Sequence, residues 1–407
     1  MIKKIKDNFV NLKTESKILV YLFSTIRIVP LIRGIFVNIF VYKVTSNIET
    51  VIWFNIIYNL FLSGSVIFFN FIAQKYKINL KKILNIPHFF FLLSTVIIFS
   101  NQSFEYAVAS IFLSSIGLGA FRAGFQPYHF DRIDKKEKQF YSGMLASFNA
   151  FIGIATPFIS ALILFLVPEN IIDPYLIVLL LGPISYLSTF FLTKNLPDYT
   201  VKIDKNKKFT FKKLFSNGKF YGYSYLMLTA VKQVEQMVLY VTGFTILKTG
   251  ANLGFYETVV GIISIIATMF LGLKQTDENI KKIIGYLALA IFGIHIFLAF
   301  NLNLTGYIIF GLISIILKPL FHATTISTTM NIMNRFKEDF NSQTALMVRE
   351  IILLIGRVSL LFLLYLFIKN NPNSTSMLKE SIVLISLFPI LVWISLSIYE
   401  KKYNKSN

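Results

Sequence analysis

The chain has 407 residues, of which 55% are hydrophobic and only 15% are charged. A soluble domain carries about 25% charged residues, so the composition excludes an ordinary soluble protein and predicts a surface partly covered by lipid. At about 20 apolar residues for each crossing, the length allows roughly twelve membrane-spanning helices. There is no cysteine, and the four histidines have no metal-ligand spacing, so we expect no disulfide, metal or cofactor.

The predicted elements are apolar helices that follow a basic segment at residues 1–17. The first apolar run is too long for a signal peptide and has no small-residue cleavage site after it, so we expect a retained helix. The twelve expected spans cover residues 18–41, 50–73, 84–100, 106–127, 140–167, 174–193, 221–247, 253–273, 283–300, 304–328, 344–368 and 381–399. The predicted fold class is therefore an all-α membrane protein with twelve transmembrane helices.

Lysine and arginine are concentrated in alternate loops, of which the stretch at 195–220 is the most basic. The positive-inside rule places these loops and both termini in the cytoplasm, as expected for a multi-pass protein of a bacterial plasma membrane. The net charge of +20 then follows from topology and does not indicate a nucleic-acid partner.

Weak internal similarity predicts a duplication of six helices. A shift of 200 residues superposes INLKKIL (78–84) on ENIKKII (278–284), and it also pairs Arg122 with His322. Repeated bundles place their binding site at the interface of the repeats. The expected organisation is a cytoplasmic segment (1–17), a six-helix bundle (18–194), a basic linker (195–220), a second six-helix bundle (221–399) and a cytoplasmic tail (400–407).

These features resemble the major facilitator superfamily over essentially the whole chain. Within it, VNIFVYKVTSNIETVIWFNIIYNL (37–60) and the junction of the fourth and fifth spans are most similar to a bacterial branch of twelve-helix transporters. The stretch NFIAQKYKINLKK (70–82) keeps the basic character of the family signature but lacks its Gly and Asp. In GIATPFISA (153–161), Gly153 and Pro157 resemble the helix 5 element of exporters, although they also suit close packing and a kink.

The resemblance implies a central cavity lined by helices 1, 4, 7 and 10. Carried onto this sequence, it gives five substrate-binding candidates, and Arg33 and Lys318 either line the cavity as well or extend toward the membrane surface. The five candidates are Arg27, Arg122, Lys232, Gln236 and His322. A cavity rich in guanidinium and ammonium groups favours an anionic or zwitterionic substrate.

Glu235 is the first candidate for proton coupling, because a charge within an apolar span costs several kcal/mol unless it has a function or a partner. It is expected to exchange a proton for a salt bridge with Lys232 or Arg27. Alternatively, Lys232 and Glu235, three residues apart, neutralise each other at a packing site. Glu350 is the second candidate, although its spacing from Arg357 also suits a structural ion pair.

No phosphate-binding loop, metalloprotease motif or nucleophile elbow occurs in the sequence, so we expect no enzyme. The leading hypothesis is a monomeric secondary active transporter that moves a small organic molecule by alternating access, with proton-coupled export. The alternatives are uptake or facilitated diffusion of an organic anion and, in another class, a non-transporting receptor or scaffold. His295 is expected to be a packed histidine.

Overall fold

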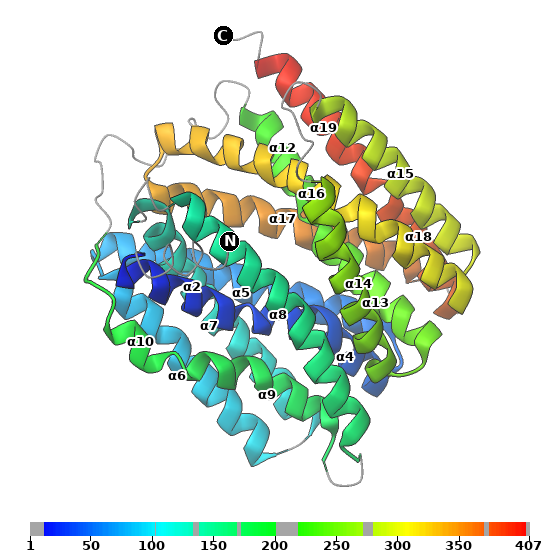
Figure 1. Ribbon diagram of the computed structural model, residues 1–407, viewed down its shortest axis with the longest axis horizontal. Coiled ribbons are helices and arrows are strands. Elements are labelled where there is room, and N and C mark those ends of the chain that lie inside the picture. The colour runs from blue at the N-terminus through cyan, green and yellow to red at the C-terminus, as the bar shows by residue number, and fades with distance from the viewer. Residues whose placement is uncertain are drawn as a thin grey trace. The chain divides into compact units, whose positions relative to one another are not determined.

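Figure 1 shows a computed structural model of the chain, which describes residues 12–101, 103–132, 138–168, 172–200, 219–271, 280–369 and 374–403. The side chain of His322 is outside this description, as are most of the predicted N-terminal segment and most of the predicted basic linker. The described residues form helices and no strand. The all-helical part of the predicted fold class is therefore confirmed within these residues.

The chain divides into two compact units, and the division cuts through two helices. Unit 1 contains residues 1–36 and 60–203, whereas unit 2 contains residues 37–59 and 204–407. Residues 37–59 group with unit 2 because α4 (Asn38–Thr45) packs on α13 (Val231–Leu247). The ring centroids of Tyr42 and Phe244 lie 6.2 Å apart at this contact. The domain boundaries expected from the sequence stay a prediction.

Unit 1 begins with two short helices of the first span and continues with the helices that precede the predicted basic linker. They are α2 (Thr14–Ile26), α3 (Ile28–Ile32), the later part of α5 (Ile48–Lys75), α6 (Leu80–Ser100), α7 (Phe104–Arg132), α8 (Lys138–Leu166), α9 (Pro174–Leu187) and α10 (Phe190–Lys194). Between α3 and α4 lies a short π-helix, η1 (Arg33–Val37).

Close helix contacts in unit 1 depend on glycine. A Cβ atom at Gly119 of α7 would lie 2.7 Å from the backbone oxygen of Leu62 in α5, and one at Gly182 of α9 would lie 3.1 Å from Cα of Val29 in α3. Small residues allow helix backbones to approach in this way within membranes. They hold α7 and α9 against their neighbours.

Unit 2 contains α12 (Lys219–Thr229), α13, α14 (Gly250–Leu271), α15 (Ile280–Phe300), α16 (Leu304–Asp339), α17 (Ser342–Ile368), α18 (Ser374–Ser386) and α19 (Phe388–Tyr403), in addition to α4. Its core joins α12, α15 and α19 through fully buried side chains such as Leu226, Ile284 and Leu396. In Figure 1, α15 runs beside α18 and α19, with which it is in contact.

Two helices of unit 2 are interrupted by single residues. Ala230 separates α12 from α13, and its N–H bonds to Met227 O, one residue nearer than in an α-helix. Leu387 separates α18 from α19, and Pro389, which has no backbone N–H to donate, follows two residues later. Within a membrane, interrupted helices are tolerated where the backbone is buried in protein or lines a cavity.

Nine helical segments among the described residues are long and apolar enough to cross a membrane, or ten when the bent segments 222–247 and 250–266 count as one span. A helix or an interrupted pair of helices overlaps each predicted apolar run. The count of twelve membrane spans stays a prediction. Large apolar side chains such as Phe165 and Tyr286, exposed by 71% and 73%, suit contact with lipid.

Candidate functional site

The polar run of α13 begins directly after the interruption at Ala230. Lys232, Glu235 and Gln236 lie in its first two turns, where α12 and α13 meet. Lys232 is exposed, Gln236 is partly buried, and Glu235 is only 9% exposed. A carboxylate buried this deeply requires compensation of its charge.

Two side chains from other helices compensate the charge of Glu235. Lys318 Nζ of α16 lies 2.7 Å from Glu235 Oε1. His295 Nε2 of α15 lies 3.2 Å from the same oxygen, and its side chain is 1% exposed. Glu235, His295 and Lys318, which we call the triad, therefore join α13, α15 and α16 through one carboxylate oxygen.

Phe310 of α16 closes one side of the triad. Lys318 Nζ lies 4.7 Å from the centroid of its ring, and the ring of His295 lies 5.1 Å from it, edge to face. A cation above an aromatic face is stabilised by the ring quadrupole. Lys318 thus extends along α16 toward Glu235 and contacts it together with Phe310. Pro319 follows directly within α16.

A second carboxylate lies on a helix that neighbours the triad. Glu257 belongs to α14, which packs on α16, the helix that carries Lys318.

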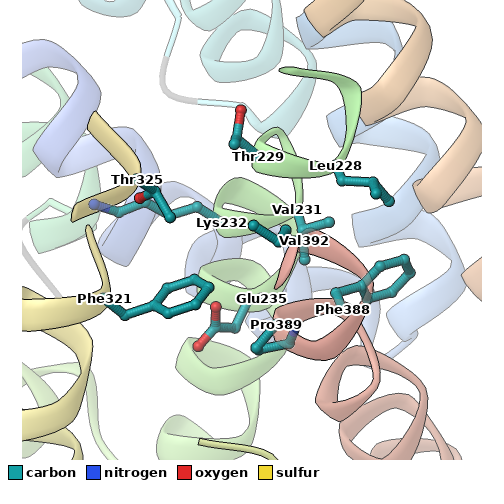
Figure 2. Close-up of a pocket in the computed structure, with 10 residues that line it drawn as sticks. All are labelled: Leu228, Thr229, Val231, Lys232, Glu235, Phe321, Thr325, Phe388, Pro389 and Val392. Atoms are coloured by element: carbon teal, nitrogen blue, oxygen red, sulfur yellow. The ribbon is translucent and has the colours of Figure 1, made fainter. Parts of the chain in front are cut away.

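A pocket with about 350 Å³ of empty space, part of it open to solvent, lies beside Glu235. The interrupted helices both contribute to it, on each side of Ala230 and directly after Leu387 (Figure 2). Its lining consists of Leu228, Thr229, Val231, Lys232, Glu235, Phe321, Thr325, Phe388, Pro389 and Val392.

Figure 2 shows how the two charged residues of the pocket are directed. Lys232 extends toward Thr325, whereas the carboxylate of Glu235 lies beside the ring of Phe321 in this view. The ion-pair partners of Glu235 among the described residues are Lys318 and His295, not Lys232. The alternative in which Lys232 and Glu235 neutralise each other is therefore not the arrangement observed.

His295 is the residue that sequence reasoning missed. It is fully buried, as expected of a packed histidine, but one of its ring nitrogens contacts Glu235. Sixty positions separate the two residues, so no spacing within one helix indicates the contact. The one feature of the sequence that could have pointed to this contact was the presence of a histidine within an apolar span.

The remaining substrate-binding candidates are distributed over both units. Arg27 follows the last residue of α2 and is exposed, and Arg122 lies in α7 and is partly buried; both belong to unit 1. His322 lies in α16, but its side chain is outside the described residues. Within unit 2, Lys232 lines the pocket and Gln236 follows one turn later.

Glu350 has a partner on its own helix. Arg357 Nη1 lies 3.7 Å from Glu350 Oε2, and the two residues are 6% and 2% exposed, respectively. A buried pair of this kind favours the structural role that their spacing suggests. Elsewhere among the described residues, no group of three or more acidic or histidine side chains suited to a metal ion occurs.

The geometry defines a class of protein: a polytopic helical membrane protein with a charged centre beside a pocket at two helix interruptions. The chain belongs to the Major Facilitator Superfamily, whose family profile matches residues 22–348. It is accordingly a transporter and not an enzyme. No curated protein sequence matches it significantly.

Solved structures similar to this chain include transporters. The human organic anion transporter MFSD10 is 8% identical, with a TM-score of 0.63 over 95% of this chain and 100% of its own. The POT family transporter PepTSo is 9% identical, with a TM-score of 0.66 over 98% and 99%. A variant of the E. coli fucose:proton symporter FucP is 13% identical, with a TM-score of 0.59 over 94% and 98%. At these identities the likeness concerns the fold alone.

Proposed function

We propose that this chain is a secondary active transporter that exports a small organic solute of anionic character across the bacterial plasma membrane, coupled to protons, by alternating access. The observation that carries the proposal is the triad, in which a buried carboxylate in contact with a lysine and a histidine borders a pocket. Discontinuous helices at a central site are a recurring feature of secondary transporters.

Glu235 is the coupling residue in this proposal. Its ionised form is stabilised by Lys318 at 2.7 Å, and its protonated form would weaken that contact. A change of protonation at this centre therefore alters the contacts that join α13 to its neighbouring helices. Glu350 keeps a structural role with Arg357.

The anionic character of the solute rests on the balance of charge at the pocket. Lys232 is the cationic lining residue, the charge of Glu235 is compensated by Lys318 from outside the lining, and the other walls are largely apolar. An amphiphilic anion suits such a lining. The fold shared with an organic anion transporter is consistent with this substrate class. Arg27, Arg122, Gln236 and His322 stay candidates for further substrate contacts.

Export is supported by the element at Gly153 and Pro157 in α8. Among the described residues, a Cβ atom at Gly153 would meet nothing within 4 Å, so close packing in unit 1 does not explain the glycine. Uptake and facilitated diffusion are the competing modes.

The test begins with ligand identification by thermal stabilisation of the purified protein, screened over organic anions, zwitterions and lipophilic cations. A ligand found in this way is then assayed in proteoliposomes for accumulation driven by a pH gradient and for counterflow exchange. We expect Glu235→Gln to abolish accumulation and to retain counterflow, because exchange of solute for solute needs no net proton movement.

Each other outcome has a definite meaning. Accumulation by Glu235→Gln equal to that of the wild type would refute the coupling role, and accumulation that requires the opposite gradient would indicate uptake. Stabilisation by lipophilic cations would make Glu235 a binding carboxylate. The absence of counterflow in the wild type would indicate a receptor or scaffold.

A further inference from the structure

The hydrogen bonds of His295 determine where its protons must be. Nδ1 lies 2.7 Å from the backbone oxygen of Ile291. A carbonyl oxygen can only accept, so Nδ1 carries a hydrogen and donates it. In a neutral imidazole with this tautomer, Nε2 has a lone pair and no hydrogen.

That lone pair would point at a carboxylate oxygen. Nε2 lies 3.2 Å from Glu235 Oε1, and two lone pairs at this distance repel each other. The contact requires one more proton, either on Nε2 or on Oε1. Because Oε1 also accepts from Lys318 Nζ at 2.7 Å, and a carboxylate is the better acceptor, the proton belongs on Nε2.

The side chains that contact the carboxylate of Glu235 among the described residues are Lys318 and His295, and Glu257 lies on α14, the helix that packs on α16.

We propose that His295 and Glu235 hold one exchangeable proton between them, with the proton on Nε2, and that the binding and release of this proton are the coupling step of the transport cycle. This inference has two halves, the position of the proton and its role in coupling. The coupling half rests on the proposed function, whereas the position of the proton does not. His295 is thereby assigned as a proton-binding residue.

Release of the proton breaks the Nε2–H bond of His295. The electron pair of that bond stays on Nε2, and the proton passes to water. Nε2 then presents a lone pair to the carboxylate of Glu235, so attraction becomes repulsion. Lys318 of α16 remains the partner of Glu235, and the link from α13 to α15 opens.

The position of the proton is tested by nitrogen NMR of the full-length protein labelled with ¹⁵N-histidine in lipid nanodiscs. At about pH 7.5, where an ordinary histidine is mostly neutral, we expect one imidazolium signal with both ring nitrogens protonated. The signal should be missing in His295→Gln. In Glu235→Gln the same ring should become neutral and keep its hydrogen on Nδ1.

His88 provides the matched control. It is also buried in a predicted span, but its Nε2 contacts the hydroxyl of Thr189 at 3.2 Å rather than a carboxylate. His88→Gln should leave the imidazolium signal in place. A wild-type spectrum in which His295 is neutral, or carries its only hydrogen on Nε2, would overturn the proposal.

The coupling half is tested with the transported ligand. Glutamine places an amide near the position of Nε2 and can donate to Glu235 without a titratable proton. We therefore expect His295→Gln to lose accumulation driven by a pH gradient and to retain counterflow. If His295→Gln still accumulates solute while Glu235→Gln does not, the role of His295 is refuted and the proposed function survives. If Glu235→Gln also accumulates solute, the proposed function fails as well.

Discussion

Glu235 illustrates at the residue scale how a buried charge acquires its partners. The sequence offered Lys232 as a neighbour on the same helix, but Lys232 extends toward Thr325 (Figure 2). The partners found are Lys318 and His295, which helix packing brings from elsewhere in the chain. Side chains three residues apart share a helix face, but nothing obliges them to pair when stronger partners converge on one oxygen.

The contact between Lys318 and Glu235 should make a measurable contribution to the free energy of unfolding. Because Lys318→Met leaves Glu235 buried beside a histidine alone, we expect a loss of roughly 3–4 kcal/mol, the lower part of the range for breaking a buried pair. Reversible denaturation or the melting temperature in detergent would measure this loss.

A double-mutant cycle provides the control. Glu235→Gln removes the uncompensated charge, so the double variant should recover most of the loss caused by Lys318→Met. Additive losses in the double variant would show that the two side chains are not coupled.

Glu350 has a different expected phenotype. Its partner Arg357 lies 3.7 Å away on the same helix, and both are buried, so Glu350→Gln should lower the melting temperature. Accumulation driven by a pH gradient should persist at the remaining folded fraction. Loss of accumulation with unchanged stability and intact counterflow would instead make Glu350 a coupling residue.

At the scale of elements, the interruptions at Ala230 and Leu387 form the pocket. Each ends one helix and starts the next, and the cavity is lined by residues on both sides of Ala230 and by residues that follow Leu387. Close packing of α17 on α12 holds the first interruption in place. A Cβ atom at Gly356 would lie 2.5 Å from the backbone oxygen of Met227.

Gly356→Ala should therefore be destabilising. The obstacle is backbone and cannot rotate away, so we expect a loss of about 1–3 kcal/mol, the usual cost of overpacking. Thermal unfolding in detergent would measure the loss.

Gly293→Ala in α15 is the matched control, because a Cβ atom there would meet nothing within 4 Å among the described residues and the position is exposed. Alanine is a better helix former than glycine, so this variant should be neutral or slightly more stable. Equal effects of the two substitutions would contradict the packing of α17 on α12.

The helices differ from their predicted extents for a physical reason. The span expected at 304–328 continues as α16 to Asp339, and the span expected at 18–41 begins as α2 at Thr14. A run of apolar residues ends where the environment changes from lipid to water, but the backbone hydrogen bonding of the helix continues beyond that point. The interruption at Ala230 was not predictable, because alanine is the strongest helix former.

For the whole molecule, the distribution of basic loops predicts the topology. Lys82, at the start of α6, should face the cytoplasm, and Thr305, at the start of α16, should face outward. The chain has no cysteine, so single-cysteine variants need no background substitutions.

We expect a membrane-impermeant maleimide to label Thr305→Cys in intact cells and to label Lys82→Cys only after permeabilisation. Labelling of both in permeabilised cells is the control for reactivity. The reverse pattern in intact cells would invert the proposed orientation of the chain.

The sequence by itself determined the class of protein, the approximate position of each helix and the presence of a carboxylate, Glu235, within an apolar span. Composition and hydropathy follow from the free energy of transferring each residue to lipid, which depends mainly on the residue itself. The choice of Lys318 and His295 as partners of Glu235 and the pocket at two interruptions came only from the tertiary structure. Contacts between α13, α15 and α16 depend on how helices rotate and approach, and no periodicity within one helix records the orientation of another.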